Sequence, residues 1–505
     1  MDEKSEKAEN LPKTRIKEQI NVITAGCFIS RQVSKSTHPT PAMTLSRRNF
    51  LRTAALATLA FPAIVRARNL NSQVQIAAVG VDGKGESDIN ECASHAKARF
   101  VGFCDIDTGR FAKIDKRHPG VTHYTDWREM FTWLGDGFDA VTVSTPDHMH
   151  ALPTMVAMRM GKHVYCQKPL THTVWEARQL RLQAAKSKVR TQMGNQIHSA
   201  KEYRTGVKLI QSGRIGKVLA VHTWHPNTGN KYTGMTAAPA SGPVPAGVNW
   251  DLWLGTAPSR EFAPDVYHPF KWRDWVDFGS GTMGDFGCHL LDPVFTALKL
   301  GAPISVKADS VGANAQTWCA QQTIEWIFPG TEYTKGNTLS VTWYDGGRLP
   351  DATLALLPPG KTLSAAGSIF IGELGVMMMP HVAMPSLYPE EKFGKNLNPG
   401  DLARRARAKN KPTDKVAVDL ADFVEGSSHY HAWVDAIADG HETTDNFAYA
   451  GPLTEAVQLG NVASRFSGVK LDWDAAAMKF PNKPEAEALL TKPYRKGWEL
   501  IAADR

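Results

Sequence analysis

Four short apolar runs in the first part of the chain restrict its fold more than any other feature. They are VQIAAV (74–79), FVGFC (100–104), AVTVS (140–144) and HVYC (163–166). Turn residues bound each run, and mixed or helical stretches separate the runs from one another. Such alternation is typical of βαβ units, whose parallel strands are buried on both faces of the sheet. The sequence therefore predicts a doubly wound α/β domain.

The strand pattern changes after Gly194. A helix is predicted over residues 173–186, and different strand-like runs follow at residues 218–224, 322–328, 338–344 and 368–371. These runs favour a largely antiparallel open sheet with helices to one side. A chain of 505 residues is long enough for two to four domains. We predict a doubly wound α/β domain over residues 68–194 and a second α/β domain over residues 195–505, interrupted by two long irregular segments, residues 226–250 and 380–415.

Residues 1–67 have the features of an export signal. Arg47 and Arg48 precede a modest apolar region, and a small-residue site ends at Ala67. This order is typical of a Tat signal; the alternative is an arginine pair at the start of an Ala-rich helix. The region before Met43 is long for such a signal, so Met43 is an alternative start. We expect export by the Tat translocase to the periplasm, with cleavage after Ala67.

Composition argues against several other classes of protein. The net charge is +8, but beyond residue 67 there remain 47 Lys and Arg against 45 Asp and Glu, with no basic stripe. We therefore expect no nucleic-acid partner. No run of 18 apolar residues occurs, so no membrane span is predicted. The six cysteines form no CxxC pair, which argues against a disulfide framework, and we expect most of them to be buried.

A glycine-rich turn, Gly80-Val-Asp-Gly-Lys-Gly85, follows the first predicted strand, where a dinucleotide-binding turn belongs. Gly80 and Gly85 take the first and third glycine positions of the GxGxxG pattern, but Asp82 replaces the second. An acid beside a pyrophosphate is unfavourable, and the adjacent Gly83 offers another point of close approach. We assign Gly80, Gly83 and Gly85 to a cofactor site.

Asp105 ends the second predicted strand, 25 residues after Gly80. An acid near this offset accepts hydrogen bonds from the adenosine ribose and repels a 2′-phosphate. The sequence therefore favours NAD over NADP, with Arg110 as the main indication to the contrary. The alternative is a solvated Asp at the end of a strand.

Several motifs together resemble the Gfo/Idh/MocA family of oxidoreductases. They are the Gly80 turn, CDID (104–107), YTDWREM (124–130), STPDHMH (144–150), YCQKPL (165–170) and GDFGCHLLD (284–292). The resemblance runs from Val74 to about Arg465. It extends to an exported subgroup with a Tat signal, which carries segments like NWDLWLG (249–255) and Trp272-Arg273 through Gly281. It implies an N-terminal Rossmann domain, a C-terminal α/β domain whose open sheet often mediates oligomers, and a nicotinamide dinucleotide between them.

The resemblance also implies which residues form the site. Lys168, Asp285 and His289 line the reaction centre. The residues assigned to the cofactor, besides the glycines and Asp105, are Thr145, Pro146, His150, Gln167, Lys168 and Asn195. The family's common Glu-Lys-Pro is here Gln167-Lys168-Pro169, which removes a negative neighbour of Lys168.

Asp285 and His289 are four positions apart, the spacing that aligns two side chains on one helix face. A histidine, with an unperturbed pKa near 6.5, suits the removal of a hydroxyl proton. In this interpretation Asp285 orients the ring, and Lys168 stabilises the alkoxide. The alternative is a histidine that is merely packed in the core.

Two other residues of the GDFGCHLLD motif are given structural roles. On a helix Cys288 points about 100° away from His289, so Asp285, Cys288 and His289 do not converge on a metal, and none is expected. Asp292 precedes Pro293 and is predicted to cap a helix that starts at the proline.

An aromatic-rich region before this motif supplies the candidates for substrate contact. They are Tyr267, His268, Trp272 and Arg273. Aromatic rings stack on sugar faces, and Arg or His binds hydroxyls or an acidic substituent. The alternative is that the tryptophans fill a domain interface.

Together these features predict an exported, NAD-dependent oxidoreductase that acts on a secondary hydroxyl of a sugar, polyol or glycoside derivative. We expect a homo-oligomer with a tightly bound cofactor, because a Tat substrate folds in the cytoplasm, where nicotinamide cofactors are available. Two alternatives stay open. One is redox-neutral glycoside cleavage by oxidation and elimination, and the other is a non-catalytic dinucleotide-bound protein, which Asp82 and Gln167 favour.

Overall fold

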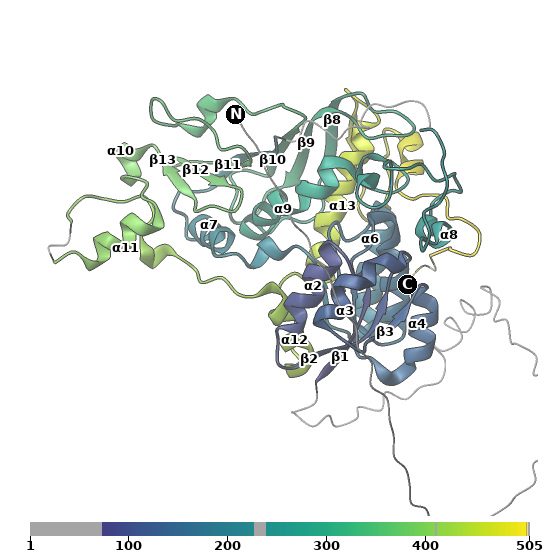
Figure 1. Ribbon diagram of the computed structural model, residues 1–505. Helices are drawn as coiled ribbons and strands as arrows, with labels where there is room; N and C mark the ends of the chain where they lie inside the picture. Colours follow the sequence, from purple (N-terminus) through teal and green to yellow (C-terminus); the bar gives the residue numbers. More distant parts are fainter. Residues whose placement is uncertain (1–72, 227–238, 410–411, 501, 503–505) are drawn as a thin grey trace, which may run out of the picture. The chain divides into compact units, whose positions relative to one another are not determined.

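Two β-sheets organise the protein (Figure 1). The structure, a computed structural model, describes residues 73–226, 239–409, 412–500 and 502, all within one compact unit. The predicted Tat signal, the alternative start and Cys27 lie outside the described residues. Within those residues no helix is both long and apolar enough to span a bilayer.

The first sheet has six parallel strands in the order β3-β2-β1-β4-β5-β6. Their bounds are β1 (Val74–Val79), β2 (Ala98–Cys104), β3 (Thr122–Tyr124), β4 (Ala140–Val143), β5 (His163–Cys166) and β6 (Thr191–Met193). The doubly wound α/β architecture predicted from the four apolar runs is confirmed. Strand order reverses between β1 and β4, and in such sheets ligands bind beyond the carboxyl ends of the strands at this point.

Successive side chains of a strand point to opposite faces of the sheet, and in β1 the buried side chains on both faces are apolar. Helices therefore cover both faces of the first sheet. On one face Ile76 and Ala78 of β1 pack with α2 (Lys84–Ala93), α3 (Phe111–Arg117) and α12 (His429–Asp439). On the other, Ala77 and Val79 pack with α4 (Trp127–Leu134), α5 (Ala151–Arg159) and α6 (Val174–Ser187). Helix α6 begins with a capping box between Thr173 and Glu176, at the start predicted from sequence.

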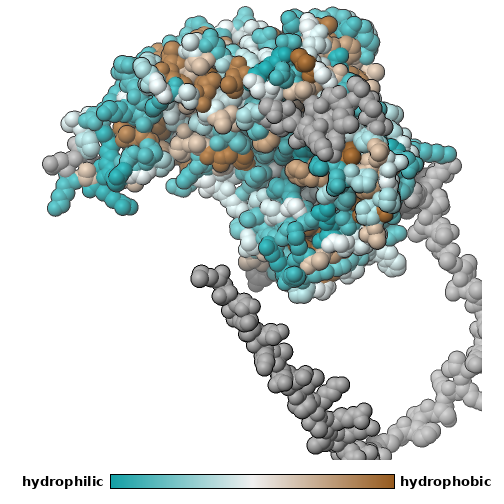
Figure 2. All heavy atoms as spheres, turned by 45° about the horizontal axis from the view of Figure 1, so that its top comes forward, coloured by the Kyte–Doolittle hydropathy of each residue, from teal (hydrophilic) through white to brown (hydrophobic). Residues whose placement is uncertain are grey.

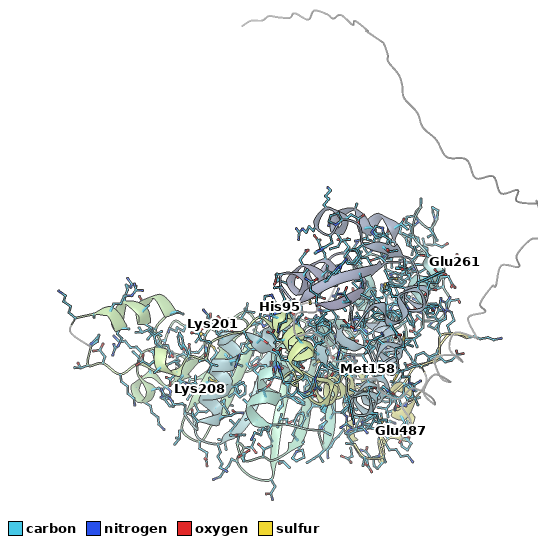
Figure 3. All side chains as sticks on the ribbon, turned by 90° about the horizontal axis from the view of Figure 1, so that it is seen from below. His95, Met158, Lys201, Lys208, Glu261 and Glu487 are labelled. Atoms are coloured by element: carbon cyan, nitrogen blue, oxygen red, sulfur yellow. The ribbon has the colours of Figure 1, made fainter. Side chains whose placement is uncertain are left out.

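Helix α12 reaches the first sheet from far along the chain. Its buried Trp433, Val434 and Ile437 join the core formed by β1, β2 and α2. His95, labelled in Figure 3, follows α2 and contacts α12, since its Nε2 lies 3.0 Å from Oδ1 of Asp435. The core of the first sheet is therefore completed by residues that lie outside the predicted range 68–194.

The second sheet has eight strands in the order β13-β12-β11-β7-β10-β9-β8-β14. Their bounds are β7 (Val218–Trp224), β8 (Ser305–Val311), β9 (Gln321–Pro329), β10 (Thr338–Asp345), β11 (Gly367–Gly372), β12 (Val376–Pro380), β13 (Ser386–Tyr388) and β14 (Lys470–Asp472). Only the pairing of β7 with β10 is parallel among these strands, so the largely antiparallel sheet predicted from sequence is confirmed.

Helices cover one face of the second sheet. They are α7 (Lys201–Gln211), α9 (Gly281–Leu298) and α13 (Phe447–Ser464). Side chains of β9 alternate accordingly: Ile324, Trp326 and Phe328 are buried under the helices, whereas Glu325 between them is exposed. Figure 2 shows hydrophobic groups scattered among hydrophilic ones on the surface in that view. Oligomerisation through the open face of this sheet stays a prediction.

The structure corrects two expectations about local structure. Residues 380–415, predicted to be irregular, contain strand β13 and the helices α10 (Glu390–Phe393) and α11 (Pro399–Arg407), which begins with Pro399 after the cap Asn398. No helix starts at Pro293, because α9 runs through it. Asp292 is therefore no cap; its buried carboxylate accepts hydrogen bonds from Tyr449 Oη at 2.7 Å and His198 Nδ1 at 2.8 Å. These partners come from distant segments that the local sequence does not reveal.

Candidate active site

A cleft of about 490 Å³ lies at the carboxyl ends of the strands of the first sheet. Gly80 and Asp105, which follow β1 and β2, line it from one side, and Asp285 and His289 of α9 line it from the other. Its volume is within the range of small-molecule sites. The cleft thus lies at the switch point of the sheet, between the two parts of the fold.

The turn after β1 needs its glycines. Gly80 has a φ of +88°, and a Cβ there would lie 2.5 Å from the carbonyl oxygen of Ser144. A Cβ on Gly85 would lie 2.2 Å from the carbonyl oxygen of Gly80, because helix and turn pack closely. Gly83, with φ of +60°, is the N-cap of α2. This is the backbone that a dinucleotide-binding turn requires, although Gly85 does not itself line the cleft.

Asp82, which takes the place of the second glycine, is neutralised by its neighbours. Its carboxylate pairs with Arg110 and, at 3.2 Å, with Lys113 Nζ. Although burial opposes the shift, the hydrogen bonds from Gly83, Arg110 and Lys113 hold the pKa of Asp82 below its usual value. An acid at this position is therefore compatible with a nearby phosphate.

Asp105 stands at the edge of the cleft with a fixed carboxylate. Its two oxygens accept hydrogen bonds from the backbone N–H groups of Val81 and Asp107, each at 3.1 Å. Burial raises the pKa of Asp105 to about 6, and these hydrogen bonds partly oppose the rise. The side chain is held where an adenosine ribose would meet it.

Three predicted cofactor residues follow β4. Thr145, Pro146 and His150 all line the cleft. The ring of His150 lies 2.8 Å from the carbonyl oxygens of both Thr145 and Pro169. It thereby ties the turn after β4 to the turn after β5, which positions Lys168.

Gln167 lines the cleft and donates its amide N–H to a buried carboxylate, Asp88 Oδ2, at 2.9 Å. Asp88 on α2 also accepts from Ser144 Oγ at 2.8 Å and pairs with Lys84. Burial raises the pKa of Asp88, while these three neighbours oppose the rise. The family's usual glutamate is absent at position 167, but Asp88 of α2 places a carboxylate beside Gln167.

Lys168 and Asp285 meet across the cleft. Lys168 Nζ lies 2.5 Å from Asp285 Oδ1 and donates to the Asp285 backbone carbonyl at 2.7 Å. Arg273 Nε lies 3.2 Å from the same carboxylate oxygen. Burial alone would raise the pKa of Asp285, but the charges of Lys168 and Arg273 hold it well below its usual range. Asp285 is therefore an ionised anchor for two cations.

His289 has a different partner from the one expected. Its Nδ1 is hydrogen-bonded to Asn195 Oδ1, and the Asn195 amide N–H donates to the Cys288 carbonyl at 3.3 Å. The amide orientation assigns the proton to Nδ1 and the lone pair to Nε2. Burial and then the charge of Lys168 hold the pKa of His289 well below 6.5, so the ring is neutral at pH 7. Asn195, predicted as a cofactor residue, is buried and outside the lining of the cleft; it orients this ring.

The four predicted substrate residues do not lie together. Trp272 and Arg273 line the cleft, and the guanidinium of Arg273 stacks on Trp272 at 4.3 Å. His268 also lines it, but its Nε2 lies 3.0 Å from Asp107, next to the predicted ribose site. Tyr267 is buried in an aromatic core with Trp253, Trp275 and Phe278 and does not line the cleft. The density of aromatic residues that suggested substrate contact at Tyr267 reflects packing.

The cleft also includes residues that sequence reasoning missed. They are chiefly Trp127, Gln196, Phe270, Phe286 and Trp498. Trp127 lies in the YTDWREM motif, so a signal for it existed. Trp498 lies beyond the motifs, in a stretch where the sequence offers no comparable signal.

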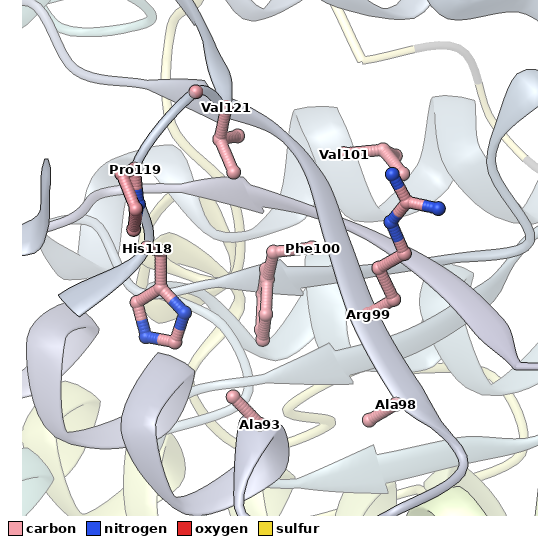
Figure 4. A pocket seen from close by; sticks show the side chains of 9 residues that line it. Ala93, Ala98, Arg99, Phe100, Val101, His118, Pro119 and Val121 are labelled. Carbon is pink, nitrogen blue, oxygen red and sulfur yellow. The ribbon is translucent and has the colours of Figure 1, made fainter.

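A second hollow of about 400 Å³ lies at the other end of β2 (Figure 4). Ala98 begins that strand, and His118, Pro119 and Val121 complete the wall. Because ligands of open α/β sheets bind at the carboxyl ends of the strands, we assign this hollow no role in the site.

The cleft, the glycine turn at Gly80 and the acid Asp105 are typical of a two-domain protein that binds a dinucleotide. Residues 74–195 match the oxidoreductase family with an NAD-binding Rossmann fold, and residues 200–338 match that family's C-terminal α/β domain. The chain belongs to the Gfo/Idh/MocA oxidoreductase family, as its motifs predicted.

Individual relatives match the chain in part. The 1,5-anhydro-D-fructose reductase of Ensifer adhaerens is 37% identical over 87 residues, which is 17% of this chain and 26% of that protein. An inositol 2-dehydrogenase of Corynebacterium glutamicum is 25% identical over 168 residues, or 32% of this chain and 49% of that protein. The chain thus spans between about a quarter and about half of the length of these relatives.

Solved structures share the fold. The WlbA dehydrogenase of Chromobacterium violaceum, in complex with NADH and UDP-GlcNAcA, aligns over 83% of this chain and 99% of that chain with a TM-score of 0.55 and 15% identity. A second structure, GenD2 in complex with NAD, aligns over 82% of this chain and all of that chain with a TM-score of 0.51 and 16% identity. At such identities the likeness establishes the fold alone.

Proposed function

We propose that the protein is an NAD-dependent oxidoreductase that transfers hydride to or from a secondary hydroxyl of a sugar, polyol or glycoside derivative. The observation that carries the proposal is the meeting of Lys168, Asp285 and His289 on the cleft that also contains Gly80 and Asp105. Membership in the oxidoreductase family and the similarity to a 1,5-anhydro-D-fructose reductase and an inositol 2-dehydrogenase support this class of substrate.

The residues divide the work of such a reaction. A bound nicotinamide would supply the hydride acceptor or donor. His289, neutral and with Nε2 unprotonated, takes the hydroxyl proton, and Asn195 fixes the ring in that tautomer. Lys168 stabilises developing alkoxide charge, and Asp285 holds the ammonium in place. In reduction the same proton moves in the opposite direction.

NAD rather than NADP fits the nucleotide end of the cleft. The Asp105 carboxylate would repel a 2′-phosphate. Arg110, the cation that argued for NADP, is occupied, because it pairs with both Asp82 and Asp107. The preference for NAD and the tight retention of the cofactor are parts of this proposal.

A screen of sugars, polyols and glycosides with purified protein tests the function. Absorbance of reduced nicotinamide and product masses are followed together, with His289→Gln as the matched control. Net reduction of NAD with a ketone product supports the proposal. Release of an aglycone without net NADH selects the oxidation and elimination alternative. Turnover that survives in His289→Gln would contradict the assigned base.

We also propose that the protein is exported by the Tat pathway to the periplasm and forms a homo-oligomer. The twin arginine, Arg47 and Arg48, supports export, and the resemblance to family members with an open second sheet supports oligomerisation. Fractionation of cells that express the Arg47→Lys, Arg48→Lys double variant tests the first, with retention in the cytoplasm expected. Light scattering of the purified protein tests the second.

A further inference from the structure

Trp498 lines the cleft although it lies 160 positions beyond the last residue that matches the family's C-terminal domain. The side chain is almost fully buried, with 1% of its surface exposed. Its backbone N–H bonds to the carbonyl of Arg495 at 2.9 Å. The stretch around it, residues 490–500, is hereafter the clasp.

The position of Trp498 identifies the end of the cleft that it closes. The guanidinium of Arg128 on α4 lies over the Trp498 ring at 4.2 Å. Trp127, which precedes Arg128 and follows β3, lines the same cleft. In the sheet order β3 lies outside β2, on the far side from the switch point. Since Asp105 at the end of β2 marks the adenosine ribose, Trp127 and Trp498 lie toward the adenine end.

The clasp is fastened to both parts of the fold. Arg495 donates to the carbonyl of Gly255 at 2.9 Å and pairs with Asp251 at 2.5 Å, which places the clasp against helix α8 (Trp250–Leu254). Lys492 Nζ donates to the carbonyl of His148 at 3.0 Å and lies 3.1 Å from Glu176 of α6. The His148 loop follows the turn that contains Thr145 and Pro146. Trp498 is therefore held in place and does not simply fill space at the surface.

A second segment, which leads into α8, is bonded to the loop after Asp105. The backbone N–H of Asn249 donates to the carbonyl of Ile106 at 2.8 Å, and that of Thr108 donates to the carbonyl of Gly247 at 3.0 Å. The loop after Asp105 is thus bound to the segment that leads into α8. Because Arg495 of the clasp bonds to Asp251 and Gly255, the α8 region joins the clasp to the loop after Asp105.

We propose that Trp498 is a binding residue for the adenine of the dinucleotide, and that the clasp slows its release. The inference rests on the proposed function and adds a residue and a retention device to it. Arg128 covers one face of the Trp498 ring, and contact of the remaining surface with a base contributes binding energy of the order that changes affinity about tenfold. Contacts of the clasp that must loosen before the base departs lower the dissociation rate further.

Fragments of the cofactor distinguish the two ends of the cleft. Binding of ADP-ribose, nicotinamide mononucleotide and NAD is measured by calorimetry for the full chain and for Trp498→Ala. We expect about tenfold weaker binding of ADP-ribose and NAD, faster release of NADH, and unchanged binding of the mononucleotide. Trp133→Ala is the matched control, because Trp133 lies on α4 with 78% of its surface exposed and outside the cleft, and it should bind all three as the wild type does.

The outcomes separate this inference from the function on which it rests. Unchanged ADP-ribose binding in Trp498→Ala, or an equal loss for all three probes, would overturn the role of Trp498. If thermal unfolding shows that Trp498→Ala does not fold, Trp498→Phe replaces it in the test. This variant should keep the fold and bind ADP-ribose more weakly than the wild type. Wild-type affinity and wild-type NADH release in Trp498→Phe would overturn the proposal. A wild-type protein that binds none of the probes contradicts the proposed function itself.

Discussion

Lys168 Nζ lies 2.5 Å from Asp285 Oδ1, although 117 positions separate the two residues in sequence. The lysine follows β5 of the first sheet, and the aspartate lies on α9 against the second. Arg273 shares the carboxylate. The pair therefore joins the two parts of the fold at the place where a substrate and a nicotinamide would meet.

Replacing Lys168 with Met should reduce turnover about 10²- to 10³-fold, the usual effect of removing one group that stabilises an oxyanion. NAD should still bind, because the turn at Gly80 and the acid at Asp105 are untouched. Steady-state kinetics and calorimetry check the two halves of this expectation. Lys201→Met, at an exposed position of α7 labelled in Figure 3, is the control and should be fully active. Equal turnover in both variants would remove Lys168 from the mechanism.

The pH profile of kcat/KM should report His289 as a base with a lowered pKa. Burial and the charge of Lys168 disfavour the imidazolium, so the active neutral form persists below pH 6.5. Activity should stay level from pH 8 down to about 6.5 and fall only at lower pH. In Lys168→Met the midpoint of the acidic limb should move to higher pH, since a positive neighbour is lost. A limb centred at or above 6.5 in the wild type would contradict the assignment.

Asn195→Ala should lower kcat about 10-fold to 100-fold with little change in KM, because the His289 ring loses its orienting partner and not its contact with substrate. Asn195→Asp keeps an acceptor for Nδ1 but adds a negative charge. We expect it to recover part of kcat and to shift the acidic limb of the profile to higher pH. A purely structural role of Asn195 would leave that limb in place.

Asp105→Asn should weaken NAD binding and improve binding of NADP relative to it, since repulsion of a 2′-phosphate is removed. Asp82→Asn in the same background should improve NADP binding further, because it frees Arg110 from one of its carboxylates. Ratios of kcat/KM for the two cofactors measure the effect. A wild-type enzyme that prefers NADP would refute the assignment of Asp105.

Stability should depend on pH through His198, which does not line the cleft. Burial opposes the shift, but the Asp292 carboxylate raises the pKa of His198 to about 9. A pKa raised in the folded state contributes stability that is fully present below about pH 6.5 and is lost as pH rises toward 9. The contribution is of the order of 3 kcal/mol.

Thermal unfolding between pH 6 and pH 9.5 tests this. The wild type should lose stability across that range more steeply than His198→Gln. His123→Gln, on a surface strand beside Asp115, serves as the control and should follow the wild type. Parallel curves for the wild type and His198→Gln would show that the His198 and Asp292 contact is not an ion pair.

Much of the fold could be predicted because short apolar runs and helical periodicity indicate its strands and helices locally. β1, β5 and β7 match the predicted runs at both ends, and α6 lies within one residue of the predicted helix at each end, with Thr173 as its N-cap. The three-residue strands β3 and β6 were not predicted, since strands so short depend on pairing with their neighbours in the sheet. Likewise α10 and α11 hold four and nine residues in a segment whose composition suggested a loop.

The candidate site was predictable where residue types belong to motifs, as for Lys168, Asp285 and His289. Partnerships between distant residues were not. Asn195 orients His289 from 94 positions away, and Gln167 meets Asp88 from 79 away. Asp292 was misread because Pro293 usually limits a helix, whereas here tertiary contacts around α9 keep the helix continuous. Only packing decides such cases.

The place of α12 has a consequence for the order in which the protein can mature on the ribosome. Strand β1 is made early, but Trp433 of α12, which completes its core, is made more than 350 residues later. Helices α2 and α3 can cover part of this face early, but the part under α12 stays uncovered until nearly the whole polypeptide has been synthesised. Chaperone contact during synthesis should accordingly concentrate on this face and end when α12 docks.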